Sequence, residues 1–483
     1  MKKIIVLTLV VALFIPLVGC GEKSDKKISN YDISISLNAD MTLDGKMTYS
    51  FTPNSDISSV YFSLYPNAFS STAEISPVYK MDELLAYPNG KSYGDIQITT
   101  VKSRGKVLDF EVTGKNNGTL KVGLNETVKS GKETDIYIEF KVKLANVKHR
   151  TGYGDDTVNL TNFYPVACVL ENGKYYESVY YPAGDPFYLE CSNYKVSLTV
   201  PPTYVVASSL APISTVWSAD NTEYNYEREN VRDIAFILSK NYNVLEKTCN
   251  GVSVKYYYYG DKNPEKTLET ACSSLRYFSD KYYRYPYAEY VVAEGDFIYG
   301  GMEYPCLSLI SSSVSNDYRD YVVAHETAHQ WFYGILGVNQ NEIGFFDEGL
   351  TELSTALFLS EYTDTSLDNY VNQAINSYLS IREALVYAGN TRPPVMDRNL
   401  KDFSSEAEYV MIAYNRSEIA FNDVRKTLGD AKFFKFIKGF INQNAYKNVT
   451  LKDFEKALNK TSKTAGKVFN LYVNGEKVVQ KAE

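Results

Sequence analysis

Two histidines four positions apart, His325 and His329, constrain the fold of this 483-residue chain more than any other feature. Apolar and aromatic residues recur around them at helical spacing, so we predict that both imidazoles lie on one face of a helix running from about Ser315 to Leu336. Glu348 follows after eighteen intervening residues, where an acidic stretch predicts the start of a second helix. The chain must therefore fold so that two helices bring two imidazoles and one carboxylate together.

These three side chains form the ligand set of a hydrolytic zinc site. Two neutral imidazoles and a carboxylate hold Zn²⁺ at about 2.0–2.1 Å, and a fourth position left to water distinguishes a catalytic site from a structural one. We predict one zinc ion per chain on His325, His329 and Glu348, with Glu326 as the general base. The alternative is that the histidines are core residues and Glu348 an ordinary first-turn carboxylate. Glu352, one turn on, either supports a ligand or is a surface charge.

The N-terminus has the pattern of an export signal. Two lysines precede an apolar run at residues 4–18, which is short for a permanent membrane span. The run ends in Leu-Val-Gly-Cys20, which resembles a bacterial lipobox and implies that residues 1–19 are removed and Cys20 is acylated. The protein would then be exported and lipid-anchored to the outer face of the bacterial cytoplasmic membrane, with residues 20–30 as a tether. A plain secretory signal and an uncleaved anchor are the alternatives.

Composition excludes some partners. The net charge is −8 and lysines and arginines form no basic stripe, so nucleic acid is not an expected partner. Nothing in the sequence predicts a protein partner. Five cysteines follow Cys20 without the spacing of a disulfide framework, although export would permit a bridge such as Cys168–Cys191.

Periodicity divides the chain into a β-rich part and a mostly helical part. Polar and apolar residues alternate in runs separated by Asn-Gly turn signals across residues 31–248. From about residue 263 the pattern becomes helical, with an apolar interruption at 290–310. Three amphipathic helices are predicted near the end of the chain, at 415–428, 430–443 and 451–460. We predict a multidomain protein of α and β structure: a β-rich N-terminal domain (31–248), a domain that carries the zinc ligands (249–425) and a short helical C-terminal lobe (426–483).

The segment Gly300-Gly301-Met302-Glu303 is the candidate for binding substrate. Adjacent glycines allow a backbone to approach closely, and the segment predicts an edge strand to which a peptide could add as a further strand. Glu303 has apolar neighbours, and burying its carboxylate would require a cation, which the α-ammonium of a peptide could supply. The alternative is a turn with a surface glutamate.

Together, the His325-Glu-x-x-His329 segment, Glu348 and the upstream Gly-x-Met-Glu303 resemble the gluzincin zinc aminopeptidases of the aminopeptidase N and leukotriene-hydrolase type. The resemblance implies a β-rich saddle domain followed by a thermolysin-like, mostly α catalytic domain. It covers most of the chain after the export signal, and its strongest motifs lie within residues 300–417. It assigns Glu303 to the amino terminus of the substrate.

Tyr414 is similar to the family's tyrosine that binds the tetrahedral oxyanion, and Tyr409 to a second tyrosine often found before it. Departures from the family's usual residues at Tyr304, Tyr333 and Arg416 leave the zinc ligands, the base and the amine anchor in place. Many relatives carry a large C-terminal helical domain, so a chain with only a short lobe is expected to have a more open cleft.

The expected function is that of a zinc-dependent metallopeptidase, an aminopeptidase that removes N-terminal residues from peptides through a zinc-activated water. Its expected partners are peptides with a free N-terminus. Two alternatives remain. One is a zinc endopeptidase, which would also cleave blocked peptides. The other is a non-catalytic, zinc-containing surface lipoprotein that binds peptides.

Overall fold

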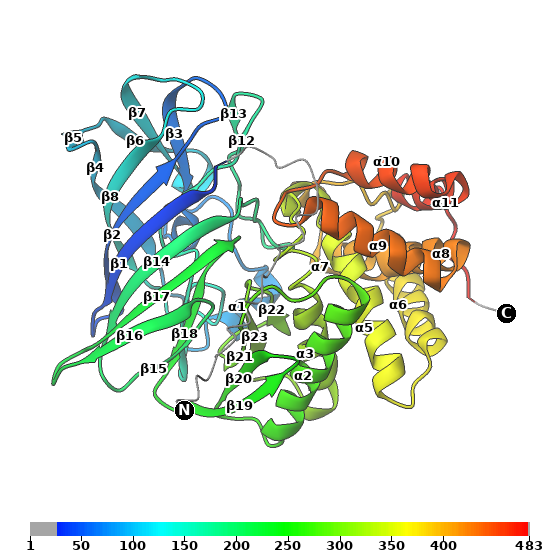
Figure 1. Cartoon of the computed structure of the whole chain (residues 1–483). Helices are drawn as coiled ribbons and strands as arrows, with labels where there is room; N and C mark the ends of the chain where they lie inside the picture. Colours follow the sequence, from blue (N-terminus) through cyan, green and yellow to red (C-terminus); the bar gives the residue numbers. More distant parts are fainter. Residues whose placement is uncertain (1–26, 482–483) are drawn as a thin grey trace, which may run out of the picture.

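The computed structural model describes residues 27–481, which divide into a β-rich half and a mostly helical half that lie side by side (Figure 1). The predicted signal segment and Cys20 lie outside the described residues. Within residues 27–481, none of the helices has the length and apolar character needed to span a bilayer. The predicted order of a β-rich region followed by a mostly helical region is confirmed.

An eight-stranded sheet dominates the β-rich half, with strand order β16-β17-β14-β1-β2-β8-β4-β5. In β1 every second residue is buried, as the alternating sequence predicts for a strand with one face on the core. The strand pairs antiparallel with β2 and parallel with β14. The strands of this sheet are β1 (Ser29–Leu37), β2 (Thr42–Phe51), β4 (Asp95–Ser103), β5 (Lys106–Val107), β8 (Thr134–Lys143), β14 (Ser192–Val200), β16 (Ala211–Trp217) and β17 (Thr222–Val231).

Smaller sheets complete this half and connect it to the helical half. One has the order β15-β18-β10-β9, a second the order β11-β3-β7-β6, and β12 and β13 form a hairpin. Their bounds are β3 (Ile57–Ser63), β6 (Phe110–Thr113), β7 (Thr119–Val128), β9 (Gly152–Tyr153), β10 (Thr157–Thr161), β11 (Val166–Ala167), β12 (Leu170–Glu171), β13 (Lys174–Tyr175), β15 (Val205–Ser208) and β18 (Ala235–Ser239). A short helix, α1 (Glu83–Ala86), follows a single 3₁₀ turn, η2 (Lys80–Asp82).

A five-stranded sheet of order β19-β20-β21-β23-β22 supports the helices that follow it. The strands β20, β21 and β23 are parallel, and β22 pairs antiparallel at the edge, as expected for the glycine-rich segment. The predicted domain boundary, between residues 248 and 249, falls at the end of β19. Because β19 pairs with β20 of the following domain, this pairing favours a boundary before β19. The bounds are β19 (Asn243–Cys249), β20 (Val252–Tyr258), β21 (Glu289–Gly295), β22 (Gly301–Met302) and β23 (Leu307–Ser311).

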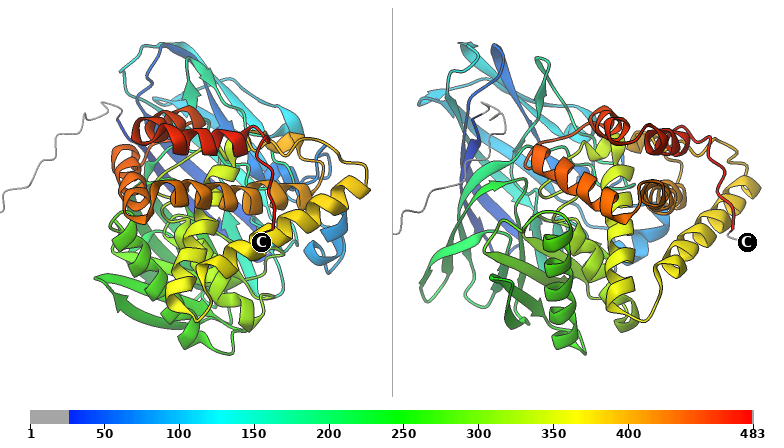
Figure 2. Two further views of the ribbon diagram at one scale, coloured as in Figure 1. Left: turned by 90° about the vertical axis from the view of Figure 1, so that its right-hand side faces the viewer. Right: turned by 45° about the vertical axis from the view of Figure 1, so that its right-hand side comes forward.

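The helices gather on the side of the molecule away from the eight-stranded sheet (Figure 2). The three predicted C-terminal helices are found as α8, α9 and α10, and Thr450 caps α10 through a reciprocal capping box with Asp453. The helices are α2 (Pro264–Lys281), α3 (Asn316–Ala328), α4 (Gln340–Ile343), α5 (Phe345–Tyr362), α6 (Leu367–Tyr387), α7 (Glu406–Tyr409), the π-helical η5 (Val410–Arg416), α8 (Ser417–Leu428), α9 (Asp430–Asn444), α10 (Leu451–Thr461) and α11 (Lys463–Val473).

The histidine helix is shorter than predicted. It ends at Ala328, with His329 at its C-cap, whereas the apolar stripe had extended it to Leu336. Beyond the helix the chain forms tight turns, in which the amide of Gly334 donates to the carbonyl of His329 at 3.0 Å. Phe332 and Leu336 lie in this non-helical segment, and both side chains are buried. Their spacing of four residues was therefore misinterpreted as part of the helix.

The cysteine pairing also differs from the suggested bridge. A disulfide joins Cys249, at the end of β19, to Cys272 in α2, with the two Cα atoms 5.6 Å apart. The suggestion of Cys168–Cys191 was wrong, since both are free, as is Cys306. The observed pair is 23 residues apart in sequence, and only the packing of α2 against β19 brings its members together.

Candidate metal centre

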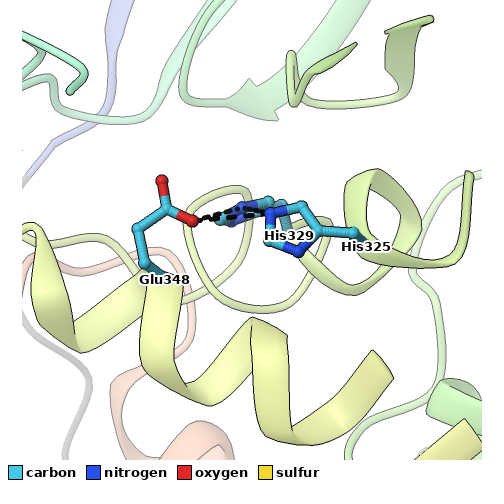
Figure 3. A group of neighbouring side chains, drawn as sticks. All are labelled: His325, His329 and Glu348. Carbon is cyan, nitrogen blue, oxygen red and sulfur yellow. Dashed lines mark hydrogen bonds and ion pairs between the residues drawn. The ribbon is translucent and has the colours of Figure 1, made fainter. Parts of the chain in front are cut away.

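Two packed helices bring the three predicted zinc ligands together (Figure 3). His325 lies in the last turn of α3, His329 directly follows that helix, and Glu348 lies in the first turn of α5. The two Nε2 atoms are 3.1 Å apart, and Oε2 of Glu348 lies 3.4 Å from each of them. All three side chains are buried.

This triangle of donor atoms fits a zinc ion. Bonds of 2.0–2.1 Å at tetrahedral angles separate two ligand atoms by roughly 3.3–3.4 Å, close to the observed separations. Among the described residues, Oε2 of Glu348 has no hydrogen-bond donor, although it is buried. A buried carboxylate oxygen facing two imidazole nitrogens is satisfied by a cation placed between them.

Other groups orient each imidazole from behind. Nδ1 of His325 lies 3.1 Å from Oε1 of Glu352, and Nδ1 of His329 lies 2.9 Å from the carbonyl oxygen of Phe332. Both acceptors favour a proton on Nδ1, which leaves the Nε2 lone pair free for a metal. Glu352 is 8 % exposed, so the reading of a surface charge was wrong.

Glu326 lies beside the metal ligands and lines the cavity above them. Its Oε2 atom is buried without a hydrogen-bond partner among the described residues. Burial raises the pKa of this carboxyl to about 7, although the two imidazoles act in the opposite direction. A Cβ atom on Gly301 would lie 2.5 Å from Oε1 of Glu326, so a glycine is required where β22 passes the carboxylate. The carboxyl is therefore placed as a proton acceptor at the edge strand.

Tyr414 approaches the same centre from the π-helical segment η5. Its hydroxyl donates a hydrogen bond of 2.7 Å to Oε1 of Glu348, and its ring stacks on His325 with centroids 6.0 Å apart. Burial and the charge of Glu348 raise the pKa of the phenol well above its usual value, so the hydroxyl keeps its proton. The structure therefore places a neutral hydrogen-bond donor next to the metal ligands, where the resemblance predicts one.

Glu303 is buried rather than exposed. It is 4 % accessible, so the alternative of a surface glutamate was wrong. Gln340 Nε2 donates to Glu303 at 3.2 Å and to Asp347 at 2.8 Å. Within residues 27–481, neither lysine nor arginine forms an ion pair with Glu303, and burial together with Asp185 raises its pKa well above the ordinary value. Among the described residues this carboxyl therefore lacks a lysine or arginine partner, and a cationic group of a ligand would neutralise it.

A cavity of about 350 Å³ connects these groups, and the β-rich half contributes part of its wall. The residues Gly300, Gly301 and Met302 line it, as predicted, together with Arg150 and Asp185, which the sequence reasoning missed. The guanidinium of Arg150 bonds to the carboxylate of Asp185 and donates to Tyr180 Oη at 3.1 Å. These two residues lie more than a hundred positions before the histidines, and no spacing signal indicated them.

Known proteins share both the helical region and the fold. Residues 266–474 match the Peptidase family M1 domain. Leukotriene A-4 hydrolase of Xenopus laevis is 25 % identical over 193 residues, which is 38 % of this chain and 31 % of that protein. Probable aminopeptidase 2 of Sulfurisphaera tokodaii is 27 % identical over 215 residues, 40 % of this chain and 26 % of that protein. The chain thus spans less than a third of the length of these curated relatives.

A solved structure has the same architecture over nearly the whole length. The M1 zinc metallopeptidase of Deinococcus radiodurans superimposes with a TM-score of 0.69 at 16 % sequence identity. The superposition covers 94 % of this chain and 96 % of the other. At this identity the likeness shows the fold, in which a β-rich domain precedes a helical domain, as predicted.

Proposed function

Because residues 266–474 form a peptidase family M1 domain, we propose that the chain is a zinc-dependent aminopeptidase that removes N-terminal residues from peptides. The observation that carries this proposal is the buried carboxylate of Glu303, which forms no ion pair with lysine or arginine within residues 27–481 and lines the same cavity as the zinc ligands. Aminopeptidases among the relatives support the same assignment.

The triangle of donor atoms supports His325, His329 and Glu348 as the zinc ligands. Zinc bound there would act as a Lewis acid and lower the pKa of a coordinated water. Glu326 accepts the proton of the attacking water and delivers it to the leaving amine. Its carboxyl suits both steps because it lines the cavity beside the metal ligands and its Oε2 atom has no hydrogen-bond partner among the described residues. Tyr414 donates its hydroxyl proton in a hydrogen bond to the carbonyl oxygen as negative charge develops there.

Glu303 positions the substrate by its amino end. The α-ammonium of a peptide would neutralise a site where Glu303, Asp185 and Asp347 are buried close together. Once the amine is held there, the first peptide bond is the one that reaches Glu326, so the chain would act as an exopeptidase. A peptide that adds as a strand beside β22 would extend from its amino end at Glu303 along this strand.

The test is cleavage of paired substrates by zinc-loaded protein, with and without a chelator. An amino-acid anilide with a free amine should be cleaved, its N-acetylated form should be cleaved at least about a hundredfold more slowly, and the chelator should abolish both reactions. Equal cleavage of the two forms would indicate an endopeptidase. Stable zinc binding without any cleavage would indicate a protein that only binds peptides.

We further propose that the protein is exported and anchored by a lipid on Cys20. Disulfides persist mainly in oxidising compartments, so the pair Cys249–Cys272 supports export independently of the N-terminal sequence. Metabolic labelling with a radioactive fatty acid should label the native protein and not the Cys20→Ala variant, which should also leave the membrane fraction. Labelling of both proteins would contradict the proposed acylation site.

A further inference from the structure

An exposed tyrosine lies on the face of α3 that carries the metal ligands. Tyr318 is in the first turn of this helix, and its position relative to His325 and His329 places all three side chains on one helix face. Both histidines line the catalytic cavity, and the side chain of Tyr318 is 53 % exposed. This ring has no part in the mechanism proposed above.

The ring of Tyr318 is held in place by stacking. It lies nearly parallel to the ring of Tyr321, with centroids 5.0 Å apart and an interplanar angle of 14°. Tyr321 in turn stacks on His325 at 6.3 Å, and its hydroxyl donates to the carboxylate of Glu352. Tyr318 and Tyr321 therefore form a fixed aromatic surface, here called the tyrosine platform, next to the metal ligands.

The tyrosine platform adjoins the general base. Partial burial and the charges of Glu352 and Glu326 raise the pKa of the Tyr318 phenol, so its hydroxyl lies within electrostatic reach of both carboxylates. Glu326 lines the catalytic cavity, and Glu352 lies behind His325. The platform is therefore placed beside the cavity, on the side of α3.

The edge strand β22 passes along α3 in the direction of that helix. A Cβ atom on Gly301 would lie 2.5 Å from Oε1 of Glu326. A Cβ atom on the preceding residue, Gly300, would lie 3.6 Å from the side chain of Val322, one turn earlier in α3. The strand and the helix thus advance together, and a peptide added antiparallel to β22 would run toward the start of α3.

The direction of a bound peptide follows from the proposed function, on which this inference rests. With its amine at Glu303 and its first carbonyl beside Glu326, the peptide runs against β22 and toward Tyr318. At 1.5 Å per helical residue, Tyr321 and Tyr318 lie about 8 and 12 Å from Glu326 along α3. An extended peptide advances about 3.4 Å per residue, so its third residue lies about 7 Å beyond the first and its side chain reaches the platform.

We propose that the tyrosine platform binds the side chain of the third substrate residue, and that the enzyme prefers peptides with an aromatic residue at this position. The ring of that residue packs on the exposed ring of Tyr318, face to face with an offset or edge to face. Peptides with a small third residue lack this contact and are cleaved less efficiently.

Two tripeptide amides with a free amine test the proposal. Both begin with the residue whose anilide the enzyme cleaves fastest, followed by alanine, and they end in phenylalanine amide or alanine amide. Release of the first residue by the zinc-loaded full chain gives kcat/KM for each. The native protein should favour the phenylalanine peptide by about fivefold or more, as expected for an added aromatic pair.

Substitutions at one position separate the ring from the rest of the site. Tyr318→Ala should bring the ratio of the two kcat/KM values close to one, whereas Tyr318→Phe keeps the ring and should keep the native ratio. Tyr387→Ala, which removes an exposed tyrosine at the end of α6, is the matched control and should also keep the native ratio.

The possible outcomes separate the two proposals. Equal kcat/KM of the native protein for the two tripeptides would overturn binding at the platform and leave the aminopeptidase assignment intact. A native preference that Tyr318→Ala does not reduce would overturn it as well, because the preference would then come from other residues. If zinc-loaded native protein cleaves neither the anilides nor the tripeptides, the proposed function fails and the platform proposal fails with it.

Discussion

The hydroxyl of Tyr414 donates a 2.7 Å hydrogen bond to Oε1 of Glu348, the carboxylate whose other oxygen faces the two imidazoles. The tyrosine therefore contacts this metal ligand through the carboxylate oxygen that does not face the histidines. To reach a substrate carbonyl it must exchange this hydrogen bond for one to the developing oxyanion. The same contact could alternatively serve only to orient Glu348, and the two roles give different results on mutation.

Tyr414→Phe should reduce kcat by about 10²–10³ and leave the zinc content at one ion per chain, because one oxyanion donor is lost and every ligand remains. Anilide hydrolysis and elemental analysis measure the two quantities. If the hydroxyl only orients Glu348, the variant will instead lose zinc, and excess zinc in the assay will restore its rate.

Glu326→Gln should abolish most of the activity, by about 10²–10⁴, since glutamine cannot accept the proton of water. The variant keeps nearly the same shape, and no ligand is removed, so zinc binding should be retained. A variant that hydrolyses anilides at the native rate would exclude Glu326 as the base.

Glu352→Gln should weaken zinc binding by about 10–100-fold, because the carboxylate fixes the orientation of the His325 ring through Nδ1. Competition with a chromophoric chelator measures the affinity. Glu361→Gln, an exposed change in the same helix, is the control and should bind zinc as the native protein does. Equal affinities of the two variants would show that Glu352 has no such role.

Asp233 should make the folded state less stable as the pH rises. Burial raises the pKa of its carboxyl from an ordinary value near 4 to about 7, so the folded protein binds a proton there that the unfolded chain releases. The resulting stability is fully present below pH 4 and is lost as the pH rises to 7, by on the order of 4 kcal/mol.

Asp233→Asn removes this titration and should flatten the pH dependence between 4 and 7. The difference in unfolding free energy between native and variant protein, measured in the same chelator-containing buffer at pH 5 and pH 8, isolates the effect. The variant should gain stability relative to the native protein at the higher pH. An unchanged difference would show that the carboxyl is ionised in the folded protein at both pH values.

The disulfide Cys249–Cys272 should contribute about 3 kcal/mol to stability, as expected for a closed loop of 23 residues. Replacing both cysteines by alanine should therefore lower the unfolding midpoint in denaturant and leave kcat unchanged, since neither residue lines the cavity. Reduction of the native protein should reproduce the shift. A midpoint that does not respond to either treatment would contradict the prediction.

The part of the site that the sequence predicted depends on local geometry. One helical turn separates His325 from His329, so their spacing alone predicts that both side chains lie on the same face of a helix. The acidic residues around Glu348 predict that it lies in the first turn of the next helix. The turn after His329 was missed because Phe332 and Leu336 are buried in a non-helical segment that happens to keep helical spacing.

Asp185 shows why the rest was not predictable. It reaches the cavity because the β-rich half packs against the helical half, and no local pattern reports such a contact between distant segments. Cys249 and Cys272 are a similar case, since the sequence contains no spacing that distinguishes this pair from the other combinations.

Gly301 leaves the carboxylate of Glu326 in contact with the bare backbone of β22. Neighbouring residues of a paired strand point to opposite faces, so a peptide bound there in a register shifted by one residue would turn the bond to be cut away from Glu326. The peptide must therefore pair with β22 in the one register that places its scissile bond beside Glu326. A side chain at position 301 would prevent this alignment, although every charged group of the site would remain in place.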